Sequence, residues 1–168
     1  GPLPVAVALA AGGALLIAID RPGRDVGDAR ELEEVSWSQA LAVGLMQVAA
    51  LWPGMSRSGA TVIGGLLAGL SRRVALEFSF FLAIPTLGAA SLFALWEARK
   101  VLVATDAPIF ALGFVVSFAV SLAVIAVLLR YVRDHDLRPF GWYRIALAVT
   151  VVVALVFDSV WATVMVFL

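Results

Sequence analysis

Long uninterrupted apolar runs alternate with short charged segments along this chain. Four runs are long enough to cross a bilayer, because about 20 helical residues at 1.5 Å each span the roughly 30 Å hydrocarbon core. They cover residues 3–19, 78–96, 107–129 and 145–166. Barrel strands would instead alternate polar and apolar residues over about ten positions. The pattern predicts an all-α integral membrane fold, with residues 1–168 forming a single transmembrane domain.

A fifth apolar region, residues 36–70, is interrupted by Pro53 and Gly54. Each of its two pieces reaches only about 20 Å as a helix, less than the hydrocarbon thickness. Two short helices that meet at a Pro-Gly break are typical of a re-entrant hairpin. We therefore expect a broken helical hairpin beside the four spans.

The polar segments predict how the spans are connected. Residues 20–34 concentrate charged side chains and are interpreted as a solvated surface loop, and residues 130–144 as a polar loop. Pro85 predicts a kink within its span. Glu77 is interpreted as an interfacial residue paired with Arg72 or Arg73, or as a residue that supports a site. Asp158 either lies near the outer interface or marks an early end of the last span.

The distribution of basic residues predicts the orientation. Only Arg99 and Lys100 lie in the loop opposite the hairpin ends. Nine of the twelve Lys and Arg residues lie on the other face: Arg21, Arg24, Arg30, Arg72, Arg73, Arg130, Arg133, Arg138 and Arg144. Because positive charge is concentrated on the cytoplasmic side of membrane proteins, this face is predicted to be cytoplasmic and both chain ends to lie outside.

The composition supports a membrane protein and argues against several classes of function. Hydrophobic residues make up 62% and charged residues 14%, with a mean hydropathy of +1.02. The formal charge of zero gives no field that would favour nucleic acid. The absence of cysteine excludes disulfides and thiolate chemistry in this chain. Gly1-Pro2-Leu3-Pro4 lacks the basic region of a signal peptide, and we expect it to be a cut end of a longer membrane protein.

The break itself carries the candidate chemistry. A helix that starts near Ser56 to Ser58 directs unpaired N–H groups and its positive dipole end toward the break, where anions bind. Arg57 adds a fixed charge with a geometry suited to phosphate oxygens. Ser56, Ser58 and Thr61 add hydroxyl donors. The alternative is that Ser58 only caps the second helix and that Arg57 extends to the membrane interface.

Other phosphate and hydrolase motifs do not fit this segment. A P-loop requires a Lys-Ser/Thr pair after its glycines, and a nucleophile elbow requires Gly-x-Ser-x-Gly. Neither pattern occurs here. Type-2 phosphatidic acid phosphatases use two catalytic histidines, whereas this chain contains only His135.

At these residues the sequence resembles the bacitracin-resistance type of undecaprenyl-diphosphate phosphatase. The resemblance covers roughly residues 1–157. It is carried by Gln47 with residues 50–61 (ALWPGMSRSGAT), by residues 73–85 (RVALEFSFFLAIP) and by residues 143–145 (YRI).

The resemblance implies hydrolysis of undecaprenyl diphosphate to the monophosphate, which recycles the lipid carrier of cell-wall synthesis and confers bacitracin resistance. It implies an enzyme of the bacterial plasma membrane, with the prenyl tail held between apolar spans and Mg or Ca as divalent cation. Arg57 and Ser56 are then the predicted catalytic residues. Ser58, Gly59, Thr61 and Gln47 are the predicted substrate-binding residues.

The resemblance also implies that this chain is half of an inverted-repeat fold. The family's earlier repeat contributes a Glu-rich motif, a second serine-containing break and a histidine, none of which is in this chain. The expected metal ligands are therefore absent from it. Two alternatives stay open: a transporter of lipid phosphates or anions, and an inactive fragment that requires a separate N-terminal half. A homo-oligomer is also left open.

Overall fold

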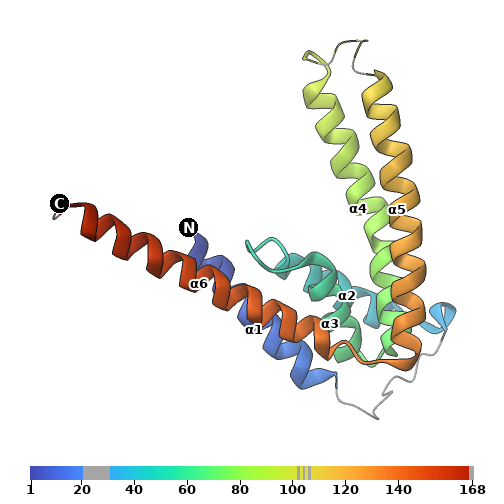
Figure 1. The fold of residues 1–168 in the computed structure, drawn as a ribbon. Helices are drawn as coiled ribbons and strands as arrows, with labels where there is room; N and C mark the ends of the chain where they lie inside the picture. Colours follow the sequence, from blue (N-terminus) through green and yellow to red (C-terminus); the bar gives the residue numbers. More distant parts are fainter. Residues whose placement is uncertain (21–30, 102, 104, 106, 167–168) are drawn as a thin grey trace.

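The computed structural model describes residues 1–20, 31–101, 103, 105 and 107–166, with side chains to residue 157. Most of the predicted loop at 20–34, and the side chain of Asp158, therefore lie outside the described residues. The regular elements of the described part are all helices (Figure 1). This confirms the all-α prediction.

Four of these helices are long and apolar enough to cross a membrane, within the described residues. They correspond to the four predicted spans: α1 (Pro2–Ile19), α4 (Arg72–Ala98), α5 (Ala107–Asp134) and α6 (Arg138–Val166).

The predicted polar loop at 130–144 is mostly helical, which corrects the interpretation from sequence. α5 continues to Asp134 and α6 begins at Arg138, so only three residues separate the helices. The Arg138 N–H donates to the Asp136 carboxylate at 3.2 Å, and Pro139 occupies an early helical position, where its missing N–H costs nothing. The polar residues of this segment therefore belong to the ends of two helices and not to a long loop.

The interrupted apolar region forms two short antiparallel helices, α2 (Trp37–Ala49) and α3 (Arg57–Leu67). Ser36 and Gln39 form a capping box at the start of α2. The Gln39 side-chain amide also donates to the Ala68 carbonyl at 3.1 Å, which joins the start of α2 to the end of α3. The short 3-10 helix η1 (Leu32–Glu34) precedes this pair.

Figure 1 shows two long helical pairs that diverge from the α2–α3 hairpin. α1 lies against α6, while α4 and α5 run together away from that pair. Gly13 and Gly141 permit the α1–α6 contact, since a Cβ on Gly13 would lie 2.7 Å from the Gly141 carbonyl oxygen. The buried core lies where α3 meets α4 and includes Ile63, Val74 and Ala75. The hairpin break lies against α1 and α6.

A buried carboxylate joins the ends of three helices. Asp20 caps α1 with 3% of its surface exposed, and its carboxylate accepts hydrogen bonds from the Arg72 guanidinium and the Leu137 N–H. Asp20 was expected in a solvated loop, and this interpretation is wrong because the carboxylate is paired and hydrogen-bonded inside the fold. The predicted pairing of Glu77 is confirmed by an ion pair with Arg73 at 2.7 Å.

Candidate functional site

The break between α2 and α3 is a compact turn seated on the first turns of α1. Gly54 has φ of +91°, a left-handed conformation that favours glycine. A Cβ at Gly54 would lie 2.6 Å from the Val5 carbonyl oxygen, so the turn contacts the α1 backbone closely. The Trp52 indole N–H donates to the Pro4 carbonyl at 3.4 Å. These contacts fix the position at which α3 begins.

The start of α3 has the geometry of an anion site. Ser56 is the N-cap, and its Oγ accepts the Gly59 N–H at 3.1 Å. The alternative that Ser58 caps this helix is therefore wrong. Ser58 Oγ instead lies 3.3 Å from Ser56 Oγ and its side chain is exposed. The N–H groups of Arg57 and Ser58 have no hydrogen-bond partner among the described residues, and they stay available to a ligand.

Arg144 reaches this helix start from α6. Its side chain is buried, with 9% of the residue surface exposed. One terminal nitrogen, Nη2, donates to the Ala8 carbonyl at 3.3 Å and to the Gly54 carbonyl at 3.4 Å. A Cβ placed on Gly59 would lie 3.3 Å from the other, Nη1. The guanidinium therefore lies between α1, the break and the first turn of α3.

The charge of Arg144 has no carboxylate partner within the described part of the chain. Its Nε is buried and lacks a hydrogen bond there. A buried charge that is paired only with carbonyl oxygens is costly, because it loses water without gaining a counter-ion. The site thus has an unmet requirement for an anion, and the unpaired N–H groups of α3 lie beside it.

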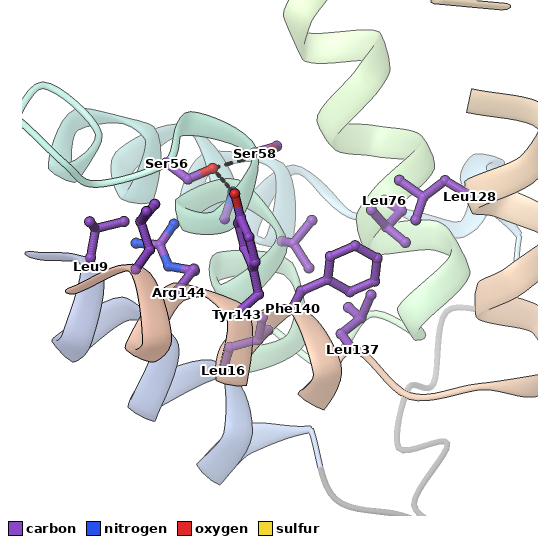
Figure 2. Close-up of a pocket in the computed structure, with 13 residues that line it drawn as sticks. Leu9, Leu16, Ser56, Ser58, Leu76, Leu128, Leu137, Phe140, Tyr143 and Arg144 are labelled. Carbon is purple, nitrogen blue, oxygen red and sulfur yellow. Dashed lines mark hydrogen bonds between the residues drawn. The ribbon is translucent and has the colours of Figure 1, made fainter. Parts of the chain in front are cut away.

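A cavity of about 410 Å³ opens at this point. Figure 2 shows Ser56, Ser58 and Arg144 at one end and Leu76, Leu128, Leu137 and Phe140 toward the other. Its lining comes from α1, α3, α4, α5 and α6, together with the Ser56 cap and Leu137 in the α5–α6 turn. The cavity therefore combines a cationic, hydroxyl-bearing end with an apolar end.

The structure brings only part of the predicted residue set to this cavity. Ser56, Ser58 and Gly59 line it. Arg57 occupies the first position of α3 and is half-buried, and its side chain forms no hydrogen bond or ion pair with the described residues. Gln47, near the end of α2, is half-buried and does not belong to the lining. Direct contact of these two residues with substrate stays a prediction.

Thr61 lies on the opposite side of α3, away from the cavity lining. Its hydroxyl lies 2.6 Å from Ser79 Oγ of α4 and 3.1 Å from each of the Arg57 and Ser58 carbonyl oxygens. The side chain is almost fully buried, at 1% exposure. In this structure Thr61 supports the first turn of α3 and links it to α4.

The predicted divalent cation has no ligand set in the described residues, where no three His, Asp or Glu side chains lie together. The described residues therefore offer no set of side chains that fits the cation.

Arg144 is the residue that sequence reasoning missed. It was assigned to the end of a polar loop, although it stands six residues inside α6. The contacts that define its role join it to residues 90 and 136 positions earlier in the chain. Two signals were present: residues 143–145 carry part of the family resemblance, and an arginine next to a long apolar run is costly at membrane depth and marks a functional position.

The sequence was compared with known proteins. A family model described as "Bacitracin resistance protein BacA" matches residues 1–150. The chain belongs to the bacitracin resistance protein family. Its curated relatives include an undecaprenyl-diphosphatase of Nitrosospira multiformis, 49% identical over 90% of this chain and 55% of the relative. An undecaprenyl-diphosphatase of Sorangium cellulosum is 52% identical over 90% of this chain and 50% of the relative.

A third member of the bacitracin resistance protein family, undecaprenyl-diphosphatase 2 of Rhodospirillum rubrum, is 49% identical over 89% of this chain and 54% of the relative. The chain spans about half the length of the curated relatives it matches. Family membership thus rests on nearly the whole chain, while only part of each relative is represented.

Proposed function

We propose that this chain forms the diphosphate-binding part of an enzyme that hydrolyses undecaprenyl diphosphate to undecaprenyl phosphate and inorganic phosphate. The observation that carries the proposal is the buried Arg144 guanidinium, without a described carboxylate partner, beside the N-terminus of α3. Membership of a family whose curated relatives are named undecaprenyl-diphosphatase supports the choice of substrate.

The chemistry required of these residues is charge stabilisation. In hydrolysis, water attacks the terminal phosphorus and the bridging P–O bond breaks, so negative charge is redistributed over the phosphoryl oxygens. Preorganised donors stabilise such charge strongly where water is excluded. Arg144 of α6, the free N–H groups of α3 and the hydroxyls of Ser56 and Ser58 supply these donors, and Arg57 supplies a second cation from the first position of α3. The proposed catalytic role of Ser56 and Arg57 is this stabilisation.

The site is proposed to lie at membrane depth on a re-entrant hairpin. Ala8, which Arg144 contacts, precedes the end of α1 at Ile19 by eleven residues, or about 17 Å of helix. That is about half of the roughly 30 Å hydrocarbon core. A lipid diphosphate would therefore be drawn toward the bilayer interior, with its tail among the spans. We further propose a multi-pass protein of the bacterial inner membrane, built as one half of an inverted repeat.

Binding and hydrolysis are tested in separate arms. In the binding arm, the chain in bilayer nanodiscs is titrated with inorganic pyrophosphate. Arg144→Ala should weaken binding about 100-fold, because charge-assisted hydrogen bonds and an unpaired buried charge are both involved. Arg99→Ala is the control, because Arg99 follows the C-terminal end of α4 and does not line the cavity. Unchanged affinity in Arg144→Ala would contradict the proposed site.

In the hydrolysis arm, phosphate release from farnesyl diphosphate is followed with this chain alone and with the chain co-expressed with the portion of the Nitrosospira multiformis relative that it does not match. Release that requires Arg144 and Arg57 supports the enzyme. Movement of lipid phosphate across liposomes without phosphate release would instead favour a transporter.

A further inference from the structure

Tyr143 precedes Arg144 on α6 and lines the same cavity. Consecutive residues of a helix project about 100° apart, so the two side chains approach the cavity from different directions. Figure 2 shows the Tyr143 ring extended toward Ser56 and Ser58, while the Arg144 guanidinium lies toward Leu9 of α1. Tyr143 is 66% exposed and Arg144 is 9% exposed. The phenol therefore lies on the exposed side of the site and the guanidinium in its interior.

The Tyr143 hydroxyl has no hydrogen-bond partner within the part of the chain that the structure describes. A phenolic O–H can both donate and accept a hydrogen bond. Because this hydroxyl is not used to hold the fold together there, it is available to a ligand that enters the cavity.

The other donors at this end of the cavity are partly used within the protein. Ser56 Oγ and Ser58 Oγ lie 3.3 Å apart, so one of their two hydroxyl protons is shared between them. Nη2 of Arg144 already donates to the Ala8 and Gly54 carbonyls. A diphosphate has two phosphoryl groups, and the oxygens of each accept hydrogen bonds. The buried donors beside Arg144 suit one group, and the second group then requires a donor on the exposed side.

We propose that the Tyr143 hydroxyl donates a hydrogen bond to the phosphoryl group of the diphosphate that Arg144 does not hold, and so favours diphosphates over single phosphates. This inference rests on the proposed function. A hydrogen bond to a charged oxygen is roughly twice as strong as one between neutral groups, so the loss of this one donor is measurable as a loss of affinity.

The test compares affinities for inorganic pyrophosphate and inorganic phosphate, each titrated onto the chain in bilayer nanodiscs. Tyr143→Phe should weaken pyrophosphate binding about tenfold and phosphate binding by less than about twofold, because the ring stays and only the hydroxyl is lost. An equal loss for both anions, or no loss for either, would overturn the inference.

The matched control is Tyr131→Phe, which should change neither affinity. Tyr131 is the other of the two tyrosines, its ring stacks on His135 with the ring centres 4.4 Å apart, and it does not line the cavity. Arg144→Ala should weaken both anions. Its failure to do so would contradict the proposed function, whereas an effect of Arg144→Ala without one of Tyr143→Phe would contradict only the role of Tyr143.

Tyrosine rings also gather at membrane interfaces, where they are held without contacting a ligand. Fluorine NMR separates the two roles and does not depend on the stability of a variant. The chain labelled with 3-fluorotyrosine should give one resonance for each tyrosine, and Tyr143→Phe assigns them. Pyrophosphate should shift the Tyr143 resonance and leave the Tyr131 resonance in place. A Tyr143 resonance that does not move at saturating pyrophosphate is the result expected of an interfacial ring, and it would refute the proposed contact.

Discussion

The guanidinium of Arg144 occupies a space that glycine leaves open. A Cβ on Gly12 would lie 2.5 Å from Nη2 of Arg144, closer than such atoms approach. The clash involves the far end of a flexible side chain, so the guanidinium, rather than the helix backbone, should move. Gly12 therefore sets the position of the charge without contacting the ligand itself.

We predict that Gly12→Ala weakens pyrophosphate binding roughly tenfold while the fold persists. Alanine favours a helix over glycine, so a general loss of stability is not expected. Gly44→Ala is the matched control, because a Cβ there meets nothing within 4 Å. Titration in nanodiscs gives the affinity, and circular dichroism reports helix content. An affinity equal to that of Gly44→Ala would show that the Arg144 position is not critical.

At the scale of elements, the contact between α3 and α4 shows whether Thr61 supports the fold of the site or contacts the substrate. The hydroxyl oxygens of Thr61 in α3 and Ser79 in α4 share a buried hydrogen bond of 2.6 Å. Removing one hydroxyl leaves the other buried without its partner, whereas removing both leaves an apolar contact.

Thr61→Val alone should therefore lower the free energy of unfolding by about 1–3 kcal/mol, and adding Ser79→Ala should recover part of that loss. Thr150→Val, an exposed threonine bonded only to the Ala146 carbonyl, should change stability by less than about 0.5 kcal/mol. Unfolding in detergent measures each change. If the double variant is stable but no longer binds pyrophosphate, the Thr61 hydroxyl is required at the site beyond its hydrogen bond to Ser79.

The elements themselves were largely predictable from local pattern. Apolar runs gave the four long helices, and Pro53 with Gly54 gave the break, because length, hydropathy and backbone restriction are local properties. The helix start at Ser56 to Ser58 was also predicted, although the sequence left open which serine caps it.

The contacts between elements were not predictable in the same way. Asp20 was expected at the surface because its neighbours are charged, yet it is buried by partners 52 and 117 positions away. Arg144 was missed for the same reason. Long-range pairing decides whether a charge is exposed or buried, and a single sequence does not reveal it.

At the scale of the whole molecule, the Asp20 contacts also bear on membrane topology. They bring together the end of α1, the start of α4 and the α5–α6 turn. The charge pattern independently predicts that these three segments share the cytoplasmic face. Since α4 and α5 are long enough to cross the membrane, the connection after α4 should then lie on the opposite side.

This topology predicts the accessibility of single cysteines, which is easily measured because the 168 residues contain none. Lys100→Cys should react with a membrane-impermeant maleimide in intact spheroplasts, whereas His135→Cys in the α5–α6 turn should react only after permeabilisation. His135 is exposed, so burial should not block its labelling. Ser58→Cys tests the depth of the break. A re-entrant hairpin predicts that the maleimide labels this cysteine slowly, whether the reagent is added from outside or reaches the cytoplasmic side. Rapid labelling of Ser58→Cys would contradict the re-entrant hairpin, and labelling of Lys100→Cys and His135→Cys from the same side would contradict the four-span arrangement.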